Sequence, residues 1–194
     1  MSDTIQTKEI LAETLKLLTN KKSFAKITIA DITKTSGFNR QTFYYHFRDK
    51  YELLEWIYRH DAQQIFDHHI SFENWHRYMA ALLTHIKQDK TFYQNTISCD
   101  DTVFKEFIFS MTKSIFFLAI DALDLHHQIS ENDKNFYSEF FSFGIAGVIG
   151  NWVKTDMKET PEKVASNLKS LAQDSEKLAY ERYRESYKIM KEEA

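Results

Sequence analysis

The chain has 194 residues, of which only four are glycine and one is proline, with 43% hydrophobic and 15% aromatic residues and a formal net charge of −3. Hairpin turns and disordered segments use far more glycine and proline than this, so the composition argues against sandwiches, barrels, glycine-loop nucleotide folds and flexible linkers, and it favours long helices. The single cysteine argues against an internal disulfide framework or a zinc ribbon, and it fits a reducing compartment.

The first sixty residues predict four helices in close succession. Helical spacing extends over residues 7–19, where the expected buried face consists of Ile10, Leu11, Thr14, Leu17 and Leu18. Thr28 and Asp31 have the form of a capping box that opens a helix over residues 29–36. Gly37 follows at the position where a helix end favours a left-handed residue.

Two further N-caps follow this glycine. Asn39 can cap a short helix over residues 40–47, and Asp49 can open a long helix that leads away from the first three. Residues 28–47 therefore have the form of a helix-turn-helix inside a small head.

The rest of the chain predicts longer helices, joined by short polar connections. We expect them at about residues 73–88, 91–98, 102–126, 133–155 and 161–190, with Pro161 at a first helical position. The predicted fold is all-α, with a three-helix head over residues 7–60 and a larger helical domain over residues 61–194.

The sequence predicts neither a signal peptide nor a membrane-spanning segment. The N-terminus lacks the basic-then-apolar pattern of a signal peptide, and the longest uncharged stretch, Phe140–Val153, has 14 residues, too few to span a bilayer. We expect a soluble cytoplasmic protein with no membrane partner.

Charge is distributed unevenly along the chain. Residues 1–50 contain nine Lys or Arg and five Asp or Glu, for a net charge of +4, whereas the remaining residues contain 16 and 23, for a net charge of −7. A basic head on an acidic body indicates that only the head meets a polyanion such as DNA. Chance segregation of solvated charges would give the same pattern.

The second short helix carries the candidate base-reading residues. With Phe43 and Phe47 facing inward, helical geometry places Gln41, Thr42 and Tyr45 on the opposite face, Tyr44 on the flank and Arg40 in the first turn. Arginine can bind guanine, glutamine can bind adenine, and Thr or Tyr can contact the thymine methyl group. Thr28 and Lys50 stand at helix N-termini that suit phosphate. His46 fits either a phosphate contact or packing on the next helix, and the whole hairpin could also be plain packing.

The segment Thr28–Leu54 closely resembles the DNA-binding segment of TetR-family transcriptional regulators, and the resemblance extends over residues 7–60. The shared features are the glycine in the turn, the run Thr42–Phe47, and a lysine followed by Glu52–Leu54. It implies phosphate contacts by Thr28, Tyr44 and Lys50, and base reading around Arg40, Gln41, Thr42 and Tyr45. Many members have a glycine where this chain has Lys21–Ser23.

The second half resembles one branch of that family more loosely. Segments 89–93, 141–154 and 158–162 are similar to the C-terminal domain of regulators that include the dihydroxyacetone-kinase operon activator. In that branch an activator can take its signal from a partner protein rather than from a small molecule. The regulated genes do not follow from this resemblance.

Three glycines recur at every third position of one predicted helix. Gly144, Gly147 and Gly150 form a strip without side chains, and each costs about 1 kcal/mol inside a helix, so a packing gain is expected to offset them. The resemblance implies a dimer interface built from the last two helices. The strip therefore predicts either a homodimer seam or a close contact within the chain.

Two pairs of adjacent histidines, His68–His69 and His126–His127, are possible metal ligands. No two histidines are three or four residues apart, the spacing that places ligands on one helical face, so we expect no metal and no cofactor. The sequence also lacks the common catalytic motifs of hydrolases, zinc proteases, nucleotide-binding enzymes and disulfide oxidoreductases, and we expect no enzyme activity.

The expected function is that of a bacterial transcriptional regulator that binds a palindromic operator as a homodimer. Its affinity for double-stranded DNA would be controlled by a small-molecule effector or a protein co-regulator at the C-terminal domain. The alternatives are a partner-controlled activator of a dihydroxyacetone-kinase-like operon, or a helical adaptor without DNA binding.

Overall fold

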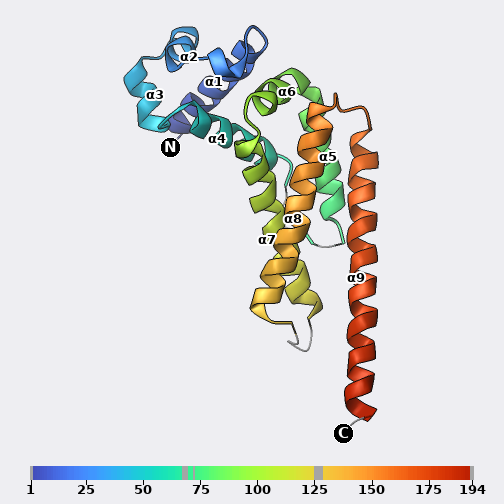
Figure 1. The fold of residues 1–194 in the computed structure, drawn as a ribbon. Helices are drawn as coiled ribbons and strands as arrows, with labels where there is room; N and C mark the ends of the chain where they lie inside the picture. Colours follow the sequence, from blue (N-terminus) through green and yellow to red (C-terminus); the bar gives the residue numbers. More distant parts are fainter. Residues whose placement is uncertain (1, 67–69, 72, 125–128, 193–194) are drawn as a thin grey trace.

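A computed structural model describes residues 2–66, 70–71, 73–124 and 129–192, and all secondary structure in these ranges is helical, as predicted (Figure 1). The elements are α1 (Ser2–Thr19), the short 3-10 helix η1 (Phe24–Lys26), α2 (Ile29–Ser36), α3 (Arg40–His46), α4 (Lys50–Gln63), α5 (Trp75–Gln88), α6 (Lys90–Cys99), α7 (Thr102–Leu123), α8 (Glu131–Lys154) and α9 (Pro161–Glu192). Among these helices, none is both long enough and apolar enough to cross a bilayer.

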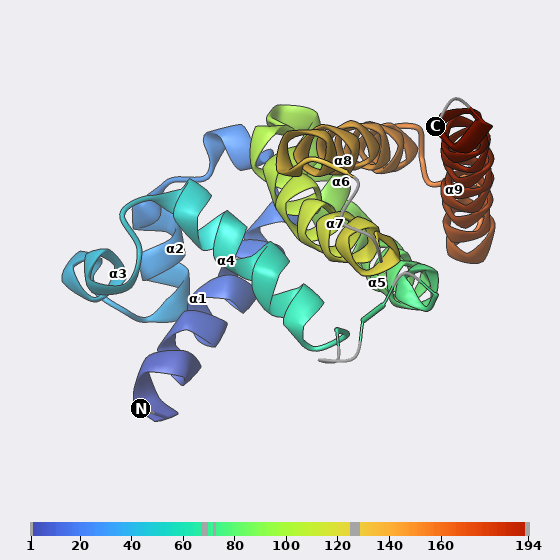
Figure 2. The ribbon, with the colours of Figure 1, turned by 90° about the horizontal axis from the view of Figure 1, so that it is seen from below.

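The helices form a small head and a larger body. The head comprises α1, η1, α2 and α3, and α4 leads from it into the body of α5–α9 (Figure 1). Within the body, α7 and α8 run antiparallel against each other, and α9 packs on α5. Seen from below, the head lies at one side of the molecule and α9 at the other (Figure 2).

The predicted helix starts in the head are confirmed by their hydrogen bonds. Thr28 Oγ1 accepts from the Asp31 amide at 3.2 Å, and the Asp31 carboxylate accepts from the Thr28 amide at 2.8 Å, which completes the capping box. Asn39 accepts from the Thr42 amide at 2.8 Å, and Asp49 caps α4. These caps fix where α2, α3 and α4 begin.

Gly37 ends α2 in the left-handed conformation, with φ of 79°. A Cβ built on this residue would meet no atom within 4 Å, so only the backbone conformation opposes a side chain here. We expect Gly37→Ala to lower the free energy of unfolding by about 1–2 kcal/mol, the cost of a left-handed L-residue. Gly37→Asn should cost less, because asparagine tolerates this region. Urea denaturation of both variants checks the prediction, and equal stability of Gly37→Ala and the unmodified protein would contradict it.

The predicted buried face of α1 is confirmed at Leu11, Thr14 and Leu18, but not at Ile10 and Leu17. Leu11 and Leu15 are fully buried, whereas Leu17 is 56% exposed and Ile10 is also exposed. The reason is tertiary: α2, α4 and α6 all pack on the side of α1 that carries Leu11 and Leu15. The helix also begins at Ser2, earlier than predicted, and η1 was not predicted.

An aromatic core connects the two parts of the molecule. Tyr58 of α4 stacks on Tyr93 of α6, with ring centroids 5.4 Å apart, and lies edge-on to Phe104 of α7 at 5.3 Å. The hydroxyl groups of Tyr58 and Thr96 share a hydrogen bond of 2.8 Å. Because all of these side chains are buried, α4 is firmly attached to the body.

Candidate DNA-binding surface

Helix α3 has one buried face and one solvent face. Phe43 and Phe47 lie in the core with 0% and 2% exposure, whereas Tyr45 is 80% exposed and Tyr44 is also exposed. Arg40 and Gln41 are exposed at the start of the helix. Thr42 is half-buried, and its hydroxyl donates to Asn39 Oδ1 at 3.1 Å.

The solvent face of α3 offers the chemistry that base reading needs. Its guanidinium, amide and two phenol groups can donate or accept hydrogen bonds at base edges in the major groove, and its rings can contact thymine methyl groups. The buried phenylalanines hold the helix in place from behind, so the exposed groups are presented on a rigid support.

Thr28 is exposed at the start of α2, but its hydroxyl is already engaged. It donates to Asp31 Oδ2 at 2.7 Å, and the same carboxylate pairs with Lys22 at 2.7 Å. The hydrogen bonds from Lys22 and then from Thr28 hold the pKa of Asp31 well below its usual value. A phosphate contact by the Thr28 hydroxyl would replace its bond to Asp31.

The ammonium group of Lys50 forms hydrogen bonds within the protein. Its Nζ donates to three main-chain oxygens, those of Phe24 at 2.8 Å, Ala25 at 3.2 Å and Ile27 at 3.0 Å, and it also lies over the Phe24 ring. Burial lowers the pKa of Lys50. The residue therefore fastens η1 to the start of α4, a role that its place in the sequence did not indicate.

His46 is half-buried between two aromatic neighbours. Its ring lies edge-on to Tyr45 with centroids 4.9 Å apart, and it also contacts Phe47. Burial and then the nearby charge of Lys8 lower the pKa of His46, which favours the neutral ring at neutral pH. The ring neighbours of His46 are its chain neighbours Tyr45 and Phe47, and a phosphate contact by this residue stays a prediction.

Two further basic residues flank the helix-turn-helix and were not singled out from the sequence. Lys26 is exposed at the end of η1, next to the start of α2, and Arg48 is 84% exposed directly after α3. The excess of basic residues in the first fifty positions indicates such cations, but it does not distinguish exposed ones from Lys50, whose ammonium group is held by main-chain oxygens. Arg48 also pairs with Asp49 at 3.6 Å and remains exposed.

One residue of α6 fixes the head on the body. The side chain of Asn95 accepts from the Phe24 amide at 2.8 Å and donates to the carbonyl groups of Thr19 at 2.7 Å and Lys22 at 3.0 Å. These bonds satisfy main-chain groups around the turn between α1 and η1. The head is therefore attached to α6 as well as to α4.

Two family models match the chain. The model for bacterial regulatory proteins of the tetR family matches residues 10–57, and the model for a transcriptional regulator C-terminal region of the same family matches residues 73–174. The chain belongs to the TetR family of transcriptional regulators. The helix-turn-helix of α2 and α3 is therefore the DNA-binding element of this regulator.

Relatives of this TetR-family protein include two curated proteins. It is 30% identical over 100 residues to the HTH-type dhaKLM operon transcriptional activator DhaS of Lactococcus lactis subsp. lactis (strain IL1403). The aligned region covers 52% of this chain and 54% of that relative. It is 40% identical over 65 residues to the HTH-type transcriptional regulator YxbF of Bacillus subtilis (strain 168), which covers 33% of this chain and 17% of that relative. The matched region thus spans about half of the first relative and less of the second.

Two solved structures share the fold. The dihydroxyacetone kinase operon activator DhaS superposes with a TM-score of 0.66 and 24% identity, over 90% of this chain and 98% of that chain. A TetR transcriptional regulator from Streptococcus agalactiae 2603V superposes with a TM-score of 0.61 and 19% identity, over 88% of this chain and 95% of that chain. At these identities the likeness establishes the fold.

The glycines of α8 in this TetR-family body lie in two different environments. Gly144 and Gly147 are exposed, and a Cβ on either would meet no atom within 4 Å. Gly150 is buried, and a Cβ there would lie 3.8 Å from Lys105 Cε of α7. The strip therefore divides into two positions open to a partner and one at a contact within the chain.

The paired histidines considered as metal ligands, His68, His69, His126 and His127, lie outside the described residues.

Proposed function

We propose that this TetR-family regulator binds a palindromic operator as a homodimer, with α3 of each subunit in a major groove. The observation that carries the proposal is the exposed face of Arg40, Gln41, Tyr44 and Tyr45 on a helix anchored by buried phenylalanines. Thr42 would join the base contacts through its methyl group, and Lys26 and Arg48 would bind phosphate. The protein acts by binding in the cytoplasm rather than by catalysis.

The homodimer is proposed to form through the exposed side of α8 together with α9. Phe136, Phe140 and Phe143 are each more than 60% exposed and recur at spacings of four and three, so they form one aromatic stripe that continues to Gly147. On α9, Leu171 and Leu178 are also exposed and one heptad apart. Large exposed apolar patches favour a protein partner, and the bare glycines allow a second helix to approach closely.

The signal is proposed to act on the body and to change the separation of the two heads. The head is held by Asn95 on α6 and by the aromatic core around Tyr58, so a shift of α4 or α6 would move α3. A signal controls DNA affinity only through its different affinity for the binding-competent and incompetent arrangements. The division near residue 60 lies within α4, so this helix would carry the movement from the body to the head.

A second candidate is an activator of a dihydroxyacetone-kinase operon whose signal is a protein. It is favoured by the 30% identity to the activator DhaS and by a body interior filled with aromatic rings, including Phe92, Tyr93 and Phe104. Titration with dihydroxyacetone and gel shifts on the promoter of a dihydroxyacetone-kinase operon separate the candidates. Specific binding to that promoter supports the second candidate, and specific binding only to other promoters contradicts it.

The DNA-binding assignments can be tested with two arginine variants. We expect Arg40→Ala to reduce discrimination at one operator base pair by about 1–3 kcal/mol, because a base contact is lost. Arg48→Ala should weaken binding to all sequences and reduce the salt slope by about one, because a phosphate contact is lost. Fluorescence anisotropy on operator and scrambled DNA at several salt concentrations measures both. If the two variants behave alike, the division into base and phosphate contacts is wrong.

A further inference from the structure

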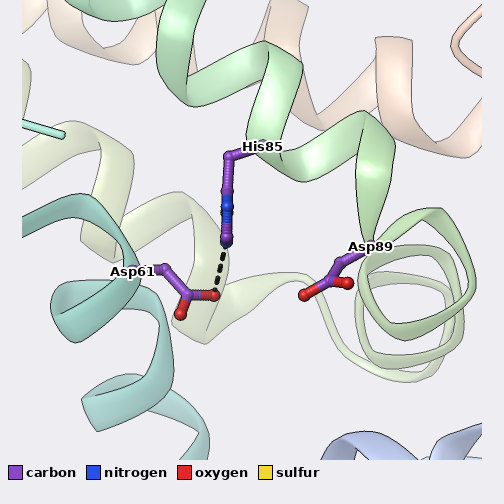
Figure 3. A group of neighbouring side chains, drawn as sticks. All are labelled: Asp61, His85 and Asp89. Atoms are coloured by element: carbon purple, nitrogen blue, oxygen red, sulfur yellow. Dashed lines mark ion pairs between the residues drawn. The ribbon is translucent and has the colours of Figure 1, made fainter. Parts of the chain in front are cut away.

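Three potential metal ligands meet where the head joins the body (Figure 3). Asp61 comes from α4, His85 from α5, and Asp89 from the junction between α5 and α6. One ligand atom of each lies within 4.8 Å of the others. We call these three residues the joint site.

A cation already occupies the space between the two carboxylates. Lys16 Nζ of α1 lies 3.0 Å from Asp61 Oδ2 and 3.0 Å from Asp89 Oδ2. Asp61 is buried, and a buried carboxylate requires a counter-charge. Burial acts to raise the pKa of Asp61, but the contacts with His85 and Lys16 outweigh it and keep this pKa below its usual value. The two ion pairs of Lys16 thus show that the joint site holds a positive charge between its carboxylates.

His85 is not satisfied by this arrangement. Its Nε2 is buried and makes no hydrogen bond of acceptable direction, although Asp61 Oδ2 lies 3.0 Å away. Two neighbouring ligands on the same metal ion, each about 2.1 Å from it, are separated by about 3.0 Å in octahedral and about 3.4 Å in tetrahedral coordination. The 3.0 Å separation of Nε2 and the Asp61 oxygen is therefore short enough for both atoms to bind one metal ion.

The surroundings suit an ion site. Tyr93 of α6 donates its hydroxyl to Asp61 Oδ2 at 3.0 Å, which orients the carboxylate from behind as an outer partner does in metal sites. The joint site opens into a groove of about 650 Å³ between α1, α4 and α5, through which an ion can enter. The other charged or titratable groups that line this groove are Glu9, Glu13 and His60.

We propose that the joint site binds a divalent first-row transition metal ion, which displaces the ammonium group of Lys16. One imidazole nitrogen and two carboxylate oxygens form a donor set that suits Zn²⁺, Mn²⁺ or Fe²⁺, whereas the imidazole disfavours Mg²⁺ and Ca²⁺. The bound ion joins α4 to α5, and α1 loses its ion pairs with both. Metal binding therefore changes the contacts that hold the head on the body. The metal proposal does not depend on the operator or dimer proposals.

Calorimetric titration of the full chain with Zn²⁺ tests this proposal. We expect one site per chain that His85→Gln and Asp89→Asn each weaken by at least about tenfold, the low end of what losing even an outer partner costs. Lys16→Met should tighten Zn²⁺ binding, because it removes the competing cation and keeps the side-chain stem. His76→Gln, on the same helix α5, is the matched control and should leave the affinity unchanged.

The variants also distinguish this site from zinc bound by histidines elsewhere. If His85→Gln and Asp89→Asn bind Zn²⁺ as the unmodified chain does, or if Lys16→Met binds it more weakly, the proposal is overturned. Circular dichroism melts confirm that each variant is folded, and Asp89→Asn is the safer of the two because Asp89 is partly exposed. Visible absorption of Co²⁺ in place of Zn²⁺ should report a nitrogen and oxygen environment that His85→Gln alters.

Discussion

Phe140→Glu is expected to convert the proposed dimer into monomers. Phe140 is 68% exposed at the centre of the aromatic stripe, and the proposed two-fold axis would bring two introduced carboxylates together in an apolar seam. Loss of a central aromatic anchor costs about 2–4 kcal/mol in many interfaces, which weakens self-association by about 30- to 1,000-fold. Operator affinity should fall with it, because a monomer engages only one half-site.

Sedimentation equilibrium measures this effect, and Ile5→Glu is the matched control. Ile5 is a similarly exposed apolar residue, at 54%, but it lies on α1 in the head, so its replacement should leave the protein dimeric. A Phe140→Glu protein that remains a dimer would place the interface outside the aromatic stripe. A Gly147→Leu variant, whose Cβ would meet no atom within 4 Å in its own subunit, should give the same result as Phe140→Glu.

Phe43→Ala is expected to lower folding stability, whereas Tyr45→Ala is expected to lower operator affinity, although the two residues lie close together on α3. Phe43 is fully buried, and truncation of a buried phenylalanine to alanine costs about 3–5 kcal/mol of folding free energy. Tyr45 is mostly exposed, so Tyr45→Ala should change the free energy of unfolding by no more than about 0.5 kcal/mol. Its operator affinity should fall, because a base contact is lost.

Denaturant unfolding and fluorescence anisotropy on operator DNA, applied to both variants, distinguish a residue that packs α3 in place from one that contacts DNA. The expected pattern is a large shift of the unfolding midpoint for Phe43→Ala only, and a loss of affinity at full stability for Tyr45→Ala. If Tyr45→Ala binds the operator normally, the face of α3 that meets DNA has been placed wrongly.

Local features were predictable because each depends on a few adjacent residues. The N-caps Thr28, Asn39 and Asp49, and the left-handed Gly37, lie where the sequence predicts them, because their hydrogen bonds reach only two or three residues along the chain. The buried face of α3 was predictable for the same reason, since two phenylalanines four residues apart leave little choice. The site residues on its opposite face remain predictions until DNA binding is measured.

Features that depend on distant partners were not predictable. Lys50 resembles a phosphate ligand in the sequence, but its ammonium group meets main-chain oxygens more than twenty residues away. Leu17 fits an apolar stripe on α1, but no neighbouring helix covers it as Leu15 is covered. The joint site combines Asp61, His85 and Asp89 from three segments, and no spacing rule connects them.

An all-helical fold, the ends of most helices and a helix-turn-helix over residues 28–47 follow from the amino-acid order alone, because capping, periodicity and turn chemistry are local; the TetR type of the head follows from its resemblance to that family. Only the packed structure shows which basic groups are exposed, which glycines of α8 are open to a partner, and which acids share a cation. These depend on the packing of helices that are far apart in the chain, and side-chain burial sets the electrostatic cost of every charge at such a contact.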